Sequence, residues 1–159
     1  MIIQGSGMEK NWKENLSAVF EELRIIQASI KEILGNFDQF CEFIAEPAFE
    51  SLSEELKQYG IKSSLKRIKG KSIDFQINFK KSRKAHFHYI ICLPENSVEL
   101  RMKLFIKGRK ERKSVMKQKE KLFMEKFGPK DIMKLSKECL IEDVIAHYRV
   151  FNFETLINP

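Results

Sequence analysis

The sequence has few of the residues that build disulfide-rich or metal-rich domains. It contains only three cysteines, Cys41, Cys92 and Cys139, and only three histidines. Because the cysteines are odd in number and widely separated, their pattern excludes a disulfide framework and the paired spacing of a zinc finger. Free, buried thiols are typical of a reduced protein, so we expect a cytoplasmic location.

Long apolar runs are also missing from the sequence. No stretch approaches the roughly 18 apolar residues that cross a bilayer, so we expect no membrane association. Near the start, Gly5 and Gly7 flank a serine, and we interpret residues 1–8 as a flexible leader outside the fold. The remaining residues, 9–159, are enough for a single domain with a core of its own.

The sequence lacks the common catalytic motifs. It has no G-x-S-x-G elbow, no P-loop, no dinucleotide fingerprint and no H-E-x-x-H pair. His86, His88 and Cys92 share one strand parity and should face one side, yet no second half of a metal site follows. Asp143 and His147, four residues apart, are interpreted as a surface ion pair on a helix. We therefore predict no cofactor, no metal and no catalytic residue, and we favour a protein that is not an enzyme.

What the sequence does have is a heptad stripe near its start. Apolar residues recur at alternating spacings of four and three, which is the seam of a helix that packs lengthwise. The residues are Trp12, Leu16, Val19, Leu23, Ile26, Ile30 and Ile33. Gly35 and Asn36 then offer a helix stop and a new cap, so we predict two helices, over 10–34 and 36–59, in preference to one bent helix. Pro47 predicts a kink or a fresh first turn inside the second helix.

A period of two replaces the helical period after Gly60. Apolar residues alternate with polar ones in four segments, 61–68, 73–79, 87–93 and 98–106, joined by short polar turns. Residues 107–121 fit either a long hairpin, which extends the sheet from 61–107 to about 126, or a solvated helix.

The predicted fold class is therefore α+β. We expect an antiparallel meander of four to five strands, covered on one face by the N-terminal helices and by a C-terminal helix over 137–152. The expected core residues are Leu23, Ile26, Phe40, Phe49, Leu52, Leu56, Phe75, Ile77, Tyr89, Ile91, Leu100, Leu104, Leu140, Val144 and Ile145.

Positive charge is concentrated in the middle of the chain. Residues 62–121 carry 19 Lys and Arg against 5 Asp and Glu, whereas residues 1–61 carry 5 against 11. This distribution favours a non-catalytic binding module that meets nucleic acid or an acidic protein through a basic sheet face and loops. The expected anion-binding residues are Lys80, Lys81, Arg83, Lys84, Arg101, Lys103, Arg109 and Lys110. No helix-turn-helix, RNP, GXXG or zinc-finger pattern adds support, and a merely solvated charged face is the alternative.

The heptad stripe supports a second functional hypothesis, an assembly subunit that forms a homodimer. The expected self-association residues are Leu16, Val19, Leu23, Ile26, Ile30 and Ile33. The competing interpretation is that this stripe packs against the sheet of its own chain. Phe20, Ile25 and Leu34 widen the stripe, which fits a globular helix or a bundle better than a thin two-stranded coil.

Overall fold

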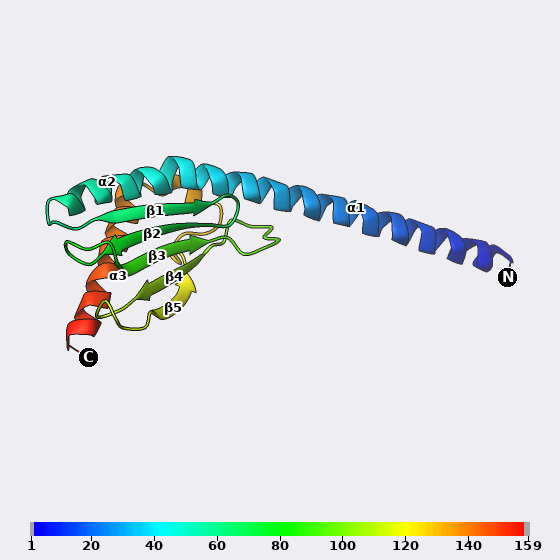
Figure 1. Cartoon of the computed structure of the whole chain (residues 1–159). Helices are drawn as coiled ribbons and strands as arrows, with labels where there is room; N and C mark the ends of the chain where they lie inside the picture. The colour runs from blue at the N-terminus through cyan, green and yellow to red at the C-terminus, as the bar shows by residue number, and fades with distance from the viewer. Residues whose placement is uncertain (1, 158–159) are drawn as a thin grey trace.

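The structure, a computed structural model, describes residues 2–157, and the side chains of residues 11–156. It consists of a long N-terminal helical rod, a five-stranded sheet and a C-terminal helix (Figure 1). In chain order the elements are α1 (Ile2–Phe40), the π-helical turn η1 (Cys41–Ala45), α2 (Glu46–Lys57), β1 (Ser63–Ile68), β2 (Ser72–Asn78), β3 (Ala85–Cys92), β4 (Lys103–Gly108), β5 (Lys117–Leu122), the 3-10 turn η2 (Ile132–Lys134) and α3 (Lys137–Ile157). None of the helices in this described range has a stretch long and apolar enough to span a bilayer.

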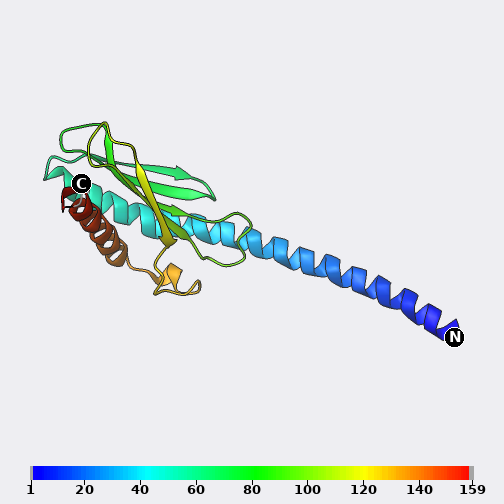
Figure 2. The ribbon, with the colours of Figure 1, turned by 90° about the horizontal axis from the view of Figure 1, so that it is seen from below.

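The sheet is an antiparallel meander, with its strands in the order β1-β2-β3-β4-β5. The helices α2 and α3 lie on the same side of it, and the opposite face has no helix over it (Figures 1 and 2). The core forms between the helices and the sheet, where the ring of Phe49 from α2 stacks on Phe75 from β2 with centroids 4.9 Å apart. The predicted α+β class, with helices on one face of an antiparallel sheet, is confirmed.

The N-terminal rod runs without a break through Gly35, so the predicted division into helices 10–34 and 36–59 is wrong. The helix begins at Ile2, and residues 2–8 of the predicted leader belong to it. The local signals at Gly35 and Asn36 are those of a stop and a cap, but Phe37 and Phe40 are fully buried in the core. A helix keeps these two side chains on one face, so tertiary packing overrides the local preference.

The rod changes its winding once, at the π-helical turn Cys41–Ala45, where the N–H of Glu46 donates to the carbonyl of Cys41. Pro47 follows at the start of α2. A proline ring clashes with the carbonyl four residues earlier and has no N–H to donate. The wider π turn accommodates both effects, which gives the fresh first turn that the sequence predicted.

Most of the expected core residues are buried, but three are exposed. Leu23 and Ile26 are 45% and 46% exposed because their part of α1 extends beyond the sheet (Figure 1). Ile145 is 48% exposed, because the buried stripe of α3 contains Leu140 and Val144 instead. The strand period is otherwise a good guide, although β4 starts only at Lys103.

A β-bulge changes the direction of one predicted strand residue. Ile77 pairs with Phe87 and the next residue, Asn78, pairs with Ala85, so His86 is the extra residue of β3. His86 therefore packs among aromatic rings, with centroids 5.0 Å from Phe151 and 4.6 Å from Phe79. The expectation that His86 shares a face with His88 and Cys92 is wrong, since a bulge shifts the alternation by one.

The continuity of the rod at Gly35 predicts that Gly35→Ala stabilises the protein. The site has open space around it and no positive φ, so alanine should raise the free energy of unfolding by about 1 kcal/mol through its better helix propensity. Chemical denaturation measures this difference. Gly70→Ala is the matched control. Gly70 has a φ of +71°, so alanine at this position should lower the free energy of unfolding. Destabilisation by Gly35→Ala would instead indicate a helix end at this position.

Candidate functional site

The outer part of α1 projects away from the rest of the molecule (Figure 1). Every side chain of residues 11–28, which we call the projecting segment, is exposed, over a length of about 27 Å. Its large apolar side chains are 45–63% exposed: Trp12, Leu16, Val19, Phe20, Leu23, Ile25 and Ile26. Contiguous apolar surface of this kind is unusual on a monomer and is typical of an interaction site.

The same apolar stripe is covered further along the rod. Ile33 packs against the core, and Phe37, Phe40 and Ile44 are buried in it. Residues 29–157, which follow the projecting segment, form what we call the head. Four of the predicted self-association residues are exposed: Leu16, Val19, Leu23 and Ile26. The other two, Ile30 and Ile33, are partly buried. The stripe therefore packs into the core of its own chain from Ile33 onward, and its earlier part is exposed.

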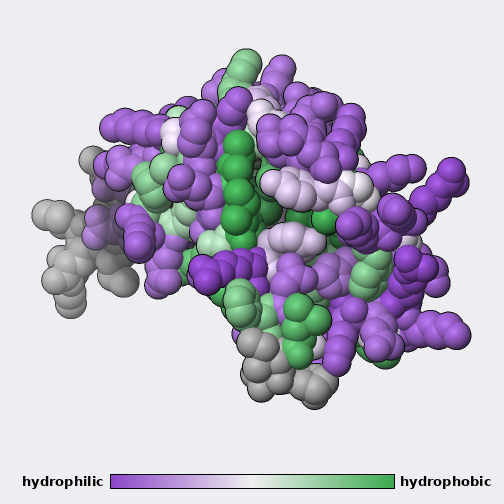
Figure 3. All heavy atoms as spheres, turned by 90° about the vertical axis from the view of Figure 1, so that its left-hand side faces the viewer, coloured by the Kyte–Doolittle hydropathy of each residue, from purple (hydrophilic) through white to green (hydrophobic). Residues whose placement is uncertain are grey.

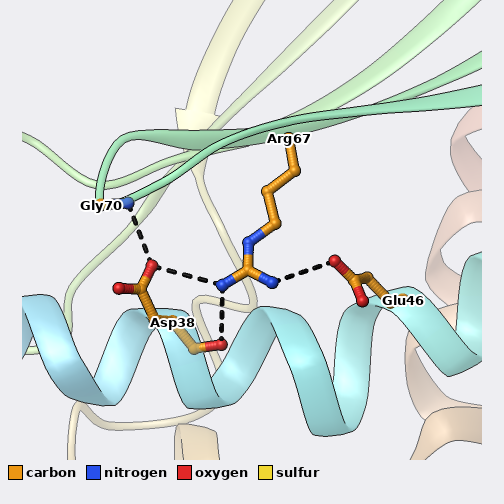
Figure 4. A network of polar contacts seen from close by, with 4 residues as sticks. All are labelled: Asp38, Glu46, Arg67 and Gly70. Atoms are coloured by element: carbon orange, nitrogen blue, oxygen red, sulfur yellow. Dashed lines mark hydrogen bonds and ion pairs between the residues drawn. The ribbon is translucent and has the colours of Figure 1, made fainter.

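A polar network fixes the rod to the sheet at the point where the rod leaves the head (Figure 4). Arg67 of β1 donates to Glu46 Oε1 at 3.0 Å and to the backbone carbonyl of Asp38 at 3.2 Å. The Asp38 carboxylate accepts a hydrogen bond from the N–H of Gly70 at 3.0 Å. Charge-assisted bonds of a half-buried guanidinium fix direction as well as distance, so this network sets the angle of the projecting segment. The thiol of Cys41 lies near this network, and its own burial raises its pKa to about 12, which keeps it protonated.

Six of the eight predicted anion-binding residues lie together at one end of the sheet. Lys80, Lys81, Arg83 and Lys84 form the β2–β3 turn, and the N–H of Arg109 donates to the carbonyl of His86 beside it. We call the cations of these turns the basic loop end; they are Lys62, Lys80, Lys81, Arg83, Lys84, Arg109, Lys110, Arg112 and Lys113. None of the nine lies within 4.0 Å of a carboxylate among the described side chains. Figure 3 views this end and shows hydrophilic side chains around smaller apolar areas.

The other two predicted residues lie at the opposite end of the sheet. Lys103 starts β4 and Gly108 ends it, so about 16 Å separates Lys103 from the basic loop end. Arg101 forms an ion pair with Glu99, and Lys103 forms one with Glu120 at 3.0 Å.

The open face of the sheet carries nearly balanced charge. The strand alternation places Lys66, Lys103 and Lys107 there together with Asp74 and Glu120. His88 of the same face forms a contact of 2.9 Å with Asp74. The concentration of positive charge therefore lies on the loops and not on this sheet face.

A cleft of about 780 Å³ lies between β5 and α3. Ile106, Val150 and Phe151 form apolar parts of its lining, and His147 lines it as well. Next to His147 is a partly buried polar chain, in which the hydroxyl of Tyr89 donates to Asp143 and Nδ1 of His147 donates to the carbonyl of residue 143 at 2.9 Å.

The charges of this polar chain support one another. Burial alone would raise the pKa of Asp143, but the hydrogen bonds from His147 and Tyr89 lower it. The hydrogen bond to Asp143 in turn raises the pKa of His147, against the opposing effect of burial. Among the described side chains, no serine, threonine or cysteine hydrogen-bonds to His147, and the chain of contacts from His147 through Asp143 to Tyr89 joins α3 to the sheet.

Sequence reasoning identified Asp143 and His147 as a surface pair, but it missed their partial burial and the hydroxyl of Tyr89 beside them. It also missed the Arg67 network and the cleft. Their residues come from elements that are far apart in the chain, so no spacing in the sequence relates them. Comparison of the chain with protein-family models, with curated proteins and with solved structures finds no match.

The raised pKa of His147 predicts that His147→Gln lowers stability more in acid than in alkali. A raised folded pKa means that the histidine stabilises the fold fully below its ordinary value of 6.5. The contribution is lost as the pH rises through the folded pKa. We expect a loss on the order of 1 kcal/mol at about pH 6 and less at about pH 9, measured by thermal unfolding.

An equal loss at both pH values would contradict a charged His147. The opposite sign applies to Asp143, whose lowered pKa gives a contribution that is present above about pH 4 and disappears as the pH falls through the folded value.

Proposed function

We propose that this protein is an assembly subunit that associates with further copies of itself through the projecting segment and displays its head on the resulting bundle. The observation that carries the proposal is the apolar stripe from Trp12 to Ile26, which no part of the described head covers. A single exposed helix of this length is only marginally stable in water. Packing against other helices would bury the stripe and stabilise the helix at the same time.

The spacing of the stripe supports a second copy of the same chain as the partner. A sustained alternation of three and four is the repeat that lets identical helices supercoil with their seams in register. In the heptad, Leu16 and Leu23 take position a, and Val19 and Ile26 take position d. In a parallel arrangement Glu22 at position g lies opposite Gln27 of the neighbour at position e, so no like charges oppose one another there.

The residue types at these positions favour more than two helices. Parallel dimers prefer β-branched residues at a and leucine at d, whereas leucine at a with β-branched residues at d shifts the preference toward trimers and tetramers. This chain has the second arrangement. Phe20, at position e and 63% exposed, adds apolar width that only a bundle of more than two helices would cover. We therefore propose a trimer or tetramer in place of the expected homodimer.

The test compares two adjacent isoleucines with almost equal exposure, Ile26 at 46% and Ile25 at 54%. Ile26 lies on the seam and Ile25 lies at position c, away from it. Ile26→Gln should dissociate the assembly, because it places a polar amide in the buried interface. Ile25→Gln should leave the mass unchanged. Light scattering after size-exclusion chromatography measures the mass directly.

The wild-type protein should have at least three times the mass of one chain, 18.7 kDa. Circular dichroism checks that the head stays folded, since neither side chain packs on it. A monomeric wild-type protein at high concentration would refute self-association. A dimer would refute the stoichiometry alone, and equal effects of both substitutions would refute the seam.

The basic loop end favours a second candidate function, the binding of a polyanion such as nucleic acid. Its nine cations gather on adjacent turns and have no carboxylate partner among the described side chains. Each phosphate that such a surface neutralises releases counterions, which gives affinity that falls steeply with salt.

For this candidate we predict salt-dependent binding of mixed-sequence RNA that is weakened in Lys80→Glu/Arg83→Glu. Fluorescence anisotropy at several salt concentrations measures it, and the affinity should fall about tenfold or more in this double variant. Arg101→Glu is the matched control, since Arg101 is at the opposite end and already paired with Glu99. Absence of RNA binding at low salt, or an equal loss in the control, would refute this candidate.

A further inference from the structure

The cleft between β5 and α3 has an apolar interior and a cationic mouth. Its lining includes Ile106, Val115, Val150 and Phe151, and it is mainly apolar. Glycine is required at position 108, because a Cβ there would lie 2.2 Å from the ring of Phe151. The absence of a side chain at Gly108 thus lets the outer edge of this ring approach β4 closely beside the cleft.

The length of the cleft follows from its two walls. On β5 the lining runs from Lys117 to Lys121, four residues further on, which is about 13 Å. On α3 it runs from His147 to Thr155, eight residues further on, which is about 12 Å. The lengths of the two walls agree, and the cleft volume of about 780 Å³ is within the usual range of small-molecule sites.

Charge changes along the cleft. At its inner end, His147 is paired with Asp143. In the middle, Lys119 donates to both carboxylate oxygens of Glu154 at 2.9 and 3.0 Å, which neutralises the pair.

At the outer end the positive charge has no such compensation. Arg109, Lys110 and Lys117 line this end, and none of them has a carboxylate partner within 4.0 Å among the described residues. Three cations without a carboxylate partner therefore gather at the outer end of the cleft, whereas the inner end has one, Lys121, beside the pair of His147 and Asp143.

We propose that this cleft binds a small amphipathic anion, namely a single alkyl chain that ends in a carboxylate or a similar headgroup. The chain lies along Ile106, Val150 and Phe151, and the headgroup contacts Arg109, Lys110 and Lys117. Charge complementarity selects this ligand, since a neutral chain leaves the three cations without an anionic partner and a cationic one is repelled by them. Arg109 Nε donates to the carbonyl of Ala85 at 2.8 Å, which holds its guanidinium at the cleft but does not neutralise its charge. The site is separate from the projecting segment and does not depend on self-association.

The test is isothermal titration of the full chain with dodecanoate below its micellar concentration. Dodecyl phosphate is a second arm, which shows whether a carboxylate or a phosphate headgroup is preferred. Dodecyltrimethylammonium has the same chain with the opposite charge. We expect saturable binding of one anion per chain and no binding of the cation.

Two variants locate the binding site. Val150→Trp fills the cleft and should weaken binding about tenfold or more, whereas Ile145→Trp, on an exposed part of α3 outside the cleft, should not. Lys110→Gln/Lys117→Gln leaves the apolar lining intact and should weaken binding of both anions by about tenfold. This charge variant keeps the test decisive if Val150→Trp fails to fold.

Several results would overturn the proposal. They are the absence of saturable heat with both anions, equal binding of dodecyltrimethylammonium, and full affinity in either the folded Val150→Trp variant or the double lysine variant. A fall in light-scattering mass caused by Val150→Trp would assign the cleft to a second copy. Binding of a glutamate-rich amphipathic peptide, sensitive to Val150→Trp and without dodecanoate binding, would assign it to a protein partner. Either result would also overturn the proposal.

Discussion

One continuous helical rod, fixed to the sheet over only part of its length, determines how the rest of this molecule is arranged. Phe37, Phe40 and Ile44 bury one end of an apolar stripe in the head, and Arg67 joins the same stretch to β1 through Asp38 and Glu46. Because a helix transmits direction along its axis, the fixed end determines where the free end points. The stripe therefore packs into the core at one end and is exposed at the other.

The strand period predicts the sheet well, because alternation is a local property that each strand carries by itself. Phe75 and Ile77, for example, are buried as expected. The errors arise where a distant contact overrides a local signal. Gly35 and Asn36 have the chemistry of a helix end, but the burial of Phe37 keeps the helix intact.

The exposed part of the stripe shows a different limit of sequence reasoning. Leu23 and Phe40 follow the same heptad pattern, yet one is exposed and the other buried. The pattern gives the face of a helix and not the identity of what covers that face. The clustering of six predicted cations at the basic loop end could be predicted from the sequence, because they lie in the polar turns that join its strands. The separation of Arg101 from them depends on the strand direction of β4, and the cleft depends on the packing of α3.

The positive charge and the apolar stripe lie on different parts of the molecule. The basic loop end is at the far end of the head from the projecting segment (Figure 1), so an assembly built on α1 would leave the cations and the cleft accessible. A bundle of projecting segments would thus present several heads, each with its charged loops facing outward. Repetition of a weak surface in this way raises its avidity without any new contact.

The most direct measurement of the central claim is hydrogen–deuterium exchange of the amides of residues 11–28 over a dilution series. If copies of the chain cover the stripe, these amides exchange slowly at high concentration and become fast on dilution, while the head keeps its protection throughout. Fast exchange in this segment at every concentration, or slow exchange that persists where light scattering reports a monomer, would contradict the account.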